Sequence, residues 1–248
     1  MGASACVMKD YTEADFKVII TNTFGKPAAS KFYMRYKNKK GIVTKDKIDI
    51  IVKKAKDVFL SHNWGKDNEG RDNHGRVVKM AEYLEDRGIK CWIDEKEMSG
   101  DIDSAMDDGI FFSRTFIACV TEDYMRKVDG QGPKEQQDNC LKEFNNAKNS
   151  KTAAKMLAVV MEKSSCSTSD WFGPLETTLG RCFYCELTSD DNFEKSMDKI
   201  VVELKKKLAY TVEELEIEAQ YTDENYESSY NFESSSYNFE SDDDDSDD

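Results

Sequence analysis

Residues 57–65 read Asp-Val-Phe-Leu-Ser-His-Asn-Trp-Gly, and this segment indicates the architecture of the whole chain. Val58, Phe59 and Leu60 form a short apolar run after a lysine-rich stretch, and a small polar and glycine cluster closes it. Such a run of β-branched and aromatic residues is typical of a central parallel strand. In open α/β sheets the loops after these strands form the ligand crevice, so we expect the loop at residues 61–73 to carry function.

Beyond this strand, apolar runs alternate with segments of helical periodicity. Val77, Met80 and Leu84 give the first helix its apolar face, and Gly88 is placed to end it. Four more strands are predicted, at residues 89–93, 115–120, 156–161 and 182–187. The helices between and after them are predicted at residues 102–110, 138–149, 174–180 and 193–208. Five alternating strands predict an α/β, flavodoxin-like three-layer fold with a five-stranded parallel sheet.

The charge is unevenly distributed along the chain and predicts three parts. The net charge of -14 combines 13 Lys and Arg against 5 Asp and Glu in residues 1–56 with no basic residue against 15 acidic ones in residues 211–248. We expect a small helical N-terminal cap with a flexible extreme N-terminus at residues 1–55 and the main domain at residues 56–209. A like-charged, low-complexity segment cannot bury enough apolar surface to order itself, so residues 210–248 are predicted to be a disordered acidic tail.

Composition excludes several classes of protein. The chain of 248 residues is 39% hydrophobic and has no apolar stretch long enough to span a membrane, and its first 20 residues do not resemble a signal peptide. The seven cysteines are odd in number and irregularly spaced, which indicates reduced thiols, and we expect a cytoplasmic protein. The acidic balance disfavours nucleic acid as a partner, except through the basic N-terminal cap. No glycine-rich phosphate-binding motif follows the first strand.

Lipid and metal sites are weakly indicated. Gly2 and Cys6 approach an acylation pattern that lacks its usual Ser or Thr, so we expect membrane contact only if both are acylated; an ordinary N-terminus is the alternative. Cys182-x-x-Cys185 is two ligands short of a zinc site. The acidic residues near the start of the helix at 102–110 are explained by the helix dipole. We therefore expect no metal.

Several segments, in their order along the chain, resemble Toll/interleukin-1 receptor (TIR) domains of intracellular protist or bacterial proteins. The resemblance covers residues 57–208 and implies a flavodoxin-like fold. The matching segments are the Asp-Val-Phe-Leu-Ser-His strand, Gly-Ile-x-x-Trp-Ile-Asp-Glu at 88–95, Met-Ser-Gly-Asp-Ile at 98–102, Gly-Ile-x-x-Ser at 109–113, the strand at 116–121 with Tyr124 after it, and Cys-Leu-Lys-Glu-Phe at 140–144.

The resemblance implies an activity and a catalytic residue. Many TIR domains cleave NAD+ at the nicotinamide–ribose bond, with a glutamate that corresponds to Glu143 here. A carboxylate suits this reaction, because nicotinamide leaves without an acid while the oxocarbenium-like ribose is stabilised by negative charge. The alternative is that Glu143 is an ordinary helix-surface carboxylate near Lys142 and Lys148.

Other positions are assigned by the same resemblance. Residues expected to contact NAD+ as substrate are Ser61, His62, Trp64, Asp94, Cys140 and Trp171. Trp64 either stacks on a ring of the dinucleotide or is a core lid, Asp94 either supports the site or caps a loop, and Trp171 is more often structural. The expected interaction loop consists of Glu97, Met98, Ser99, Gly100 and Asp101. His62 replaces an aromatic residue found in many members, and Gly100 lacks the usual neighbouring proline.

Two functions remain open at this point. The first is a TIR-domain signalling protein, of the type found in innate immunity, that acts as an NAD+ nucleosidase and yields nicotinamide with ADP-ribose or cyclic ADP-ribose after self-assembly. The second is a non-enzymatic adaptor that uses its loops for contacts with other TIR domains. Glu143 favours the enzyme, because an adaptor does not need a carboxylate there. A flavodoxin-like receiver or nucleotide binder is a more distant interpretation, and the missing phosphate loop argues against it.

Overall fold

The computed structural model describes residues 13–24, 32–94, 102–132 and 139–209. Five strands pair in parallel in the order β2-β1-β3-β4-β5. Their bounds are β1 Lys56–Ser61, β2 Cys91–Trp92, β3 Ser113–Val120, β4 Met156–Val160 and β5 Tyr184–Glu186. The order is that of flavodoxin-like sheets, so the predicted α/β fold with a five-stranded parallel sheet is confirmed.

The apolar strands bury both of their faces. In β3, Ile117 and Cys119 lie in one core, whereas Phe116, Ala118 and Val120 lie in another. This division follows from the period of two along a strand, which points successive side chains to opposite faces of the sheet. Because helices cover both faces, the strands read as continuous apolar runs instead of alternating ones.

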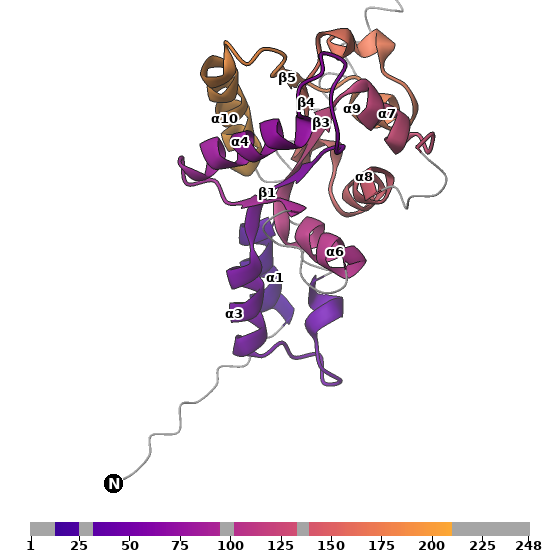
Figure 1. Ribbon diagram of the computed structural model, residues 1–248. Helices are drawn as coiled ribbons and strands as arrows, with labels where there is room; N and C mark the ends of the chain where they lie inside the picture. The colour runs from indigo at the N-terminus through magenta and orange to yellow at the C-terminus, as the bar shows by residue number, and fades with distance from the viewer. Residues whose placement is uncertain (1–12, 25–31, 95–101, 133–138, 210–248) are drawn as a thin grey trace, which may run out of the picture. The chain divides into compact units, whose positions relative to one another are not determined.

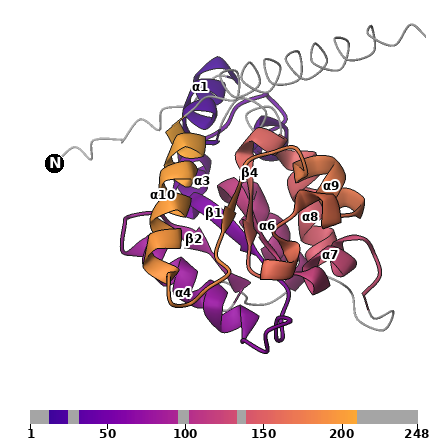
Figure 2. The ribbon, with the colours of Figure 1, turned by 90° about the horizontal axis from the view of Figure 1, so that it is seen from above.

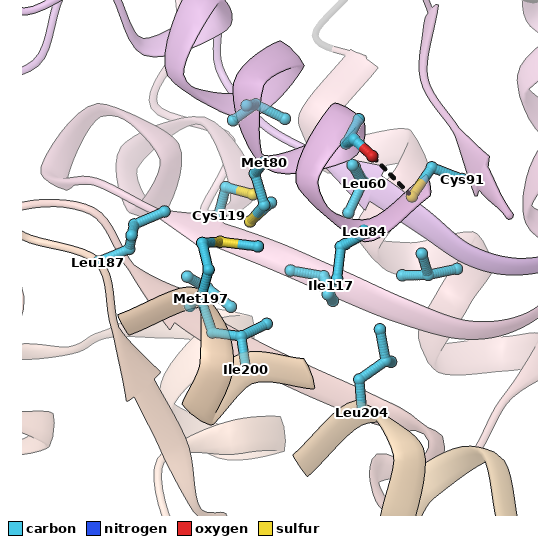
Figure 3. Close-up of a cluster of buried hydrophobic side chains, with 14 of the residues drawn as sticks. Leu60, Met80, Leu84, Cys91, Ile117, Cys119, Leu187, Met197, Ile200 and Leu204 are labelled. Carbon is cyan, nitrogen blue, oxygen red and sulfur yellow. Dashed lines mark hydrogen bonds between the residues drawn. The ribbon is translucent and has the colours of Figure 1, made fainter. Parts of the chain in front are cut away.

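Helices α4 Asn73–Glu85 and α10 Phe193–Ala209 cover one face of the sheet, and α6 Ile102–Phe112, α7 Glu122–Val128, α8 Asn139–Ser150 and α9 Gly173–Leu179 cover the other (Figures 1 and 2). Figure 3 shows the first of the two cores, in which Met80 and Leu84 of α4 lie near Ile117 of β3 and near Met197 and Ile200 of α10. Short 3₁₀ turns lie at Ala153–Lys155, Lys163–Ser165 and Thr168–Asp170.

The N-terminal segment forms a third core. Helices α1 Glu13–Phe24 and α3 Lys45–Lys54 and the helical residues 32–36 bury their apolar side chains together with Phe112, at the end of α6. The ring centres of Phe32 and Phe111 lie 4.0 Å apart. These helices therefore belong to one unit with the sheet. Because α3 leads directly into β1, this core lies toward the end of the sheet where β1 begins, away from the carboxyl ends of the strands.

Three elements differ from the sequence prediction. Strand β5 is shorter than residues 182–187, because the amide of Cys182 bonds to the carbonyl of Leu179 at the end of α9. Strand β2 is shorter than residues 89–93, because the amide of Ile89 bonds back to the carbonyl of Leu84 and so completes the end of α4. Helix α7 was not predicted. It starts at Glu122 and is capped by Thr121, whose side chain accepts a hydrogen bond from the amide of Tyr124. Its signal is visible in the sequence, since acidic residues occupy its first turn and basic residues its last.

Some predictions concern residues outside the described ranges. These include the acylation of Gly2 and Cys6, the acidic tail at 210–248, and the interaction loop at 97–101. Among the helices that the structure does describe, none has the length and apolar character needed to cross a membrane.

Candidate functional site

Ser61 and Glu143 meet at the carboxyl end of β1. Ser61 is two residues after Phe59 and so faces the same side of the sheet, where α8 packs. Its hydroxyl donates a 2.6 Å hydrogen bond to Oε2 of Glu143, and its oxygen lies 2.9 Å from the hydroxyl of Tyr124. All three side chains are buried, with Glu143 only 7% exposed. The structure thus places two of the predicted site residues in direct contact.

The direction of the hydrogen bonds follows from the number of protons. Ser61 has one hydroxyl proton and gives it to the carboxylate of Glu143, so Tyr124 donates to Ser61. Burial raises the pKa of the Tyr124 phenol well above its usual value, and the neighbouring Cys140 raises it further. Tyr124 therefore keeps its proton. The result is a buried chain from phenol to hydroxyl to carboxylate that fixes the orientation of Glu143.

Helix α8 is positioned by its own buried face. Cys140, Glu143, Phe144 and Ala147 are buried, at the spacing of one side of an α-helix. The thiol of Cys140 donates to the backbone carbonyl of His62 across 3.4 Å, which ties the first turn of α8 to the loop after β1. Cys140 thus lies beside the predicted site as a contact between elements, one turn before Glu143.

Glu143 also lines a hollow between α6 and α8. The hollow has a volume of about 390 Å³. It is lined by Met106, Asp107, Ile110, Lys142, Glu143, Asn145 and Asn146. Ligand pockets in proteins commonly span about 300–1,000 Å³, so this space is large enough for part of a dinucleotide.

A second group of side chains lies at the carboxyl ends of β1 and β2. Nε2 of His62 is 2.8 Å from Nδ1 of His74, at the start of α4. The ring of Trp64 stacks on His74 with centroids 4.0 Å apart and an angle of 14°. The indole of Trp64 donates a 2.8 Å hydrogen bond to Oδ2 of Asp94, two residues after the end of β2. The fold therefore brings together three of the predicted site residues, His62, Trp64 and Asp94. It also places His74, which was not predicted, in contact with them.

Trp64 is not a core lid, because its side chain is 59% exposed and packs on an imidazole. His62 is buried, and this burial lowers the pKa of its imidazole. The negative charge of Asp94 raises the pKa of His62, whereas the neighbouring His74 lowers it further. One ring nitrogen of His62, one of His74 and one carboxylate oxygen of Asp94 lie within 4.8 Å of one another, a spacing compatible with ligation of a cation.

Buried polar contacts hold the loop between β1 and α4. The side-chain amide of Asn73 donates to the backbone carbonyl of Asn63, and Thr121 donates to Asn63 Oδ1 across 2.6 Å. Farther along, Asp67 accepts hydrogen bonds from both Arg71 and Arg76, at 2.7 and 3.3 Å. Because Thr121 follows β3, 58 positions from Asn63, its hydrogen bond ties the loop that carries His62 and Trp64 to the rest of the fold.

Trp171 is not brought to either group. It is buried in the core, its indole donates to the backbone carbonyl of Ser165, and its ring lies 5.7 Å from that of Tyr184. This burial agrees with the structural role that is more common for such a tryptophan, and its contact with NAD+ stays a prediction. Cys182 and Cys185 remain thiols: burial raises the pKa of both, that of Cys185 to about 11. Neither joins a possible metal-binding group within the described ranges.

Sequence reasoning missed two residues of the site. Tyr124 was noted only as following a strand, although it is the buried donor to Ser61. His74 gave no signal, because it stands 12 positions from His62 in a polar stretch and only the return of α4 brings the two rings together. The composition held one clue: the chain has 2 histidines, and they are in contact.

Comparison with known proteins gives one family match. The model of the TIR domain family matches residues 58–201, more than half of the chain. Among solved structures, the chain is similar to the crystal structure of a prokaryotic SEFIR domain, with 16% identity, a TM-score of 0.47, and coverage of 60% of this chain and 99% of that one. Curated protein sequences give no significant match.

Proposed function

Because the chain belongs to the TIR domain family and is a TIR-domain signalling protein, we propose that it cleaves NAD+ at the nicotinamide–ribose bond, with Glu143 as the catalytic carboxylate. The observation that supports this most is the buried hydrogen bond from Ser61 to Glu143. A carboxylate held in one orientation beside a hollow is suited to stabilising positive charge on a substrate.

The reaction needs little from the protein besides this charge. Nicotinamide leaves as a neutral base from a cationic pyridinium, so no general acid is required. The ribose develops oxocarbenium character, which a nearby carboxylate stabilises more strongly in a buried, low-dielectric site than in water. Water or a second nucleophile then completes the reaction to ADP-ribose or to a cyclic product.

The second group of side chains supplies contacts for the rest of the substrate. Trp64 offers an exposed aromatic surface, and its orientation is fixed by His74 on one ring face and by Asp94 at its indole nitrogen. Aromatic surfaces of this kind bind the flat rings of nucleotides and attract the cationic pyridinium. We propose that Trp64 contacts a ring of NAD+ while Glu143 faces the ribose.

Self-assembly is the proposed means of activation, through the loop at residues 97–101. In the sequence this loop connects Asp94 to α6, the helix that lines the hollow beside Glu143. The alternative is an adaptor that assembles with TIR domains but does not act on NAD+. Family membership alone is compatible with either function.

The direct test is an assay of the purified full-length chain with NAD+, at low and high protein concentration, in which nicotinamide release is measured by chromatography. Release that rises more steeply than protein concentration supports an enzyme activated by assembly. A protein that assembles but releases no nicotinamide at any concentration is an adaptor.

A further inference from the structure

The cluster of His62, His74 and Asp94 has the composition of a metal site. Two imidazole nitrogens and one carboxylate oxygen lie within 4.8 Å of one another. Three protein ligands of this kind, with a further position for water, are the usual set at zinc sites that remain open to solvent. Imidazole and carboxylate ligands also suit other divalent transition metals. We propose that these three residues bind one divalent transition-metal ion, such as Zn²⁺.

The distance between the two imidazoles fits this proposal with a small movement. Zinc binds nitrogen at about 2.0–2.1 Å, so two nitrogens in a tetrahedral site lie about 3.3 Å apart. The nitrogens of His62 and His74 are 2.8 Å apart. An ion between them therefore requires the rings to separate by about half an ångström. It takes the place of the proton that the two imidazoles now share.

The surroundings of the three ligands orient them. Nδ1 of His62 lies 3.4 Å from the backbone carbonyl of Leu60, which favours a proton on Nδ1 and leaves Nε2 directed at His74. The indole of Trp64 donates to Oδ2 of Asp94. Histidine and carboxylate ligands of metals are usually held by outer hydrogen bonds of these two kinds. Trp64 also stacks on His74, so it contacts two of the three ligands.

The three ligands lie where the fold holds His62 in place and where an ion can enter from solvent. His62 is 5% exposed and belongs to the loop that Asn63 and Thr121 hold in place. His74 and Asp94 are half-buried, and Trp64 beside them is exposed, so the ion has a route from solvent and room for a water ligand. This inference does not rest on cleavage of NAD+, because it concerns binding of the ion alone.

The chain offers a specific probe, since His62 and His74 are the 2 histidines of its sequence. The full-length protein, with its histidine side chains isotope-labelled and stripped of metal by a chelator, is titrated with Zn²⁺ and followed by NMR. We expect the signals of both imidazoles to change together and to saturate at one equivalent. Binding of Zn²⁺ that leaves either imidazole unchanged, as at a cysteine, would overturn the proposal. So would the absence of binding with Zn²⁺ in excess.

Two variants test the carboxylate. Removal of an outer-shell partner alone weakens metal binding by about 10–100-fold, so loss of a ligand in Asp94→Asn should weaken Zn²⁺ binding by at least about tenfold. The matched control is Glu82→Gln, which removes an exposed carboxylate from α4, the helix that also carries His74. Wild-type affinity in Asp94→Asn, or an equal loss in Glu82→Gln, would contradict the three-residue site.

Discussion

The hydroxyl of Ser61 donates a 2.6 Å hydrogen bond to the carboxylate of Glu143 and so joins the end of β1 to the middle of α8 across 82 positions of sequence. Both residues are buried. The bond sets the orientation of the carboxylate that the proposed reaction requires. The phenol of Tyr124 donates to Ser61 and so holds the serine hydroxyl in place. Replacing each of these three hydrogen-bonded residues is expected to have a different effect.

Ser61→Ala is expected to lower both stability and activity. It removes the donor to Glu143 and leaves the hydroxyl of Tyr124 without its partner Ser61. A buried polar group that loses its hydrogen bond costs about 1–3 kcal/mol of unfolding free energy. Urea unfolding followed by circular dichroism measures the loss of stability, and nicotinamide release measures the loss of activity.

Tyr124→Phe is the matched comparison for this experiment. It keeps the bond between Ser61 and Glu143 and removes one neutral hydrogen bond, at a net cost of about 0.5–1.5 kcal/mol. We expect Tyr124→Phe to retain more activity than Ser61→Ala. The reverse order would show that the phenol, and not the serine, controls the carboxylate.

Gly109→Ala is expected to destabilise the fold without touching the candidate site. A Cβ at this position of α6 would lie 2.3 Å from the ring of Trp92, which is itself stacked on Phe59 at 4.3 Å. Overpacking of this kind costs about 1–3 kcal/mol, which in a chain of this length lowers Tm by about 2–4 °C per kcal/mol. Differential scanning calorimetry measures the shift.

Ser104→Ala on the same helix is the control for Gly109→Ala. Its side chain is exposed, so we expect a change within about 0.5 kcal/mol. If Gly109→Ala melts at the wild-type temperature, α6 is not packed as closely on Trp92 as the structure indicates.

Met98→Glu is expected to weaken self-association with the fold intact. A new charge in the loop at 97–101 adds a desolvation cost to any contact that buries it. Val202→Glu is the control, since Val202 is an exposed apolar residue on α10, far along the chain from this loop. Sedimentation velocity distinguishes them: if Val202→Glu reduces assembly and Met98→Glu does not, the interaction surface lies elsewhere.

The sequence predicted the central strands β1, β3 and β4 well because nearly all of their residues are buried, on both faces of the sheet. Residues 156–160 form an apolar run with no polar position, and such a run has few alternatives to a central strand. Strand β2 was less predictable, since it lies at the edge of the described sheet, next to β1. Its length depends on where α4 ends, and that end is fixed by a hydrogen bond from Ile89 to Leu84 that no periodicity signals.

The candidate site was predictable only in part. The polar residues after β1 indicated its location, and the family resemblance indicated Glu143. The contact between His62 and His74 was not predictable, because it depends on how the loop at 62–73 folds around the buried Asn63 and Asp67. Trp171 was assigned by the resemblance alone, and no pattern in the sequence showed that its side chain is buried in the core.

The central claim is tested most directly by comparing Glu143→Gln with the wild-type chain in the same assay of nicotinamide release. Glutamine keeps an oxygen that accepts the hydrogen bond from Ser61 and removes only the charge, so we expect the melting temperature to stay close to that of the wild type.

Loss of one charge contact to the transition state commonly lowers the rate by about 10²-fold or more, and we predict a loss of that size for Glu143→Gln. Lys148→Gln, an exposed change of charge on the same helix, is the control and should retain wild-type activity. An active wild type with an equally active Glu143→Gln variant would contradict the account, because the carboxylate that Ser61 orients would then play no part in the reaction.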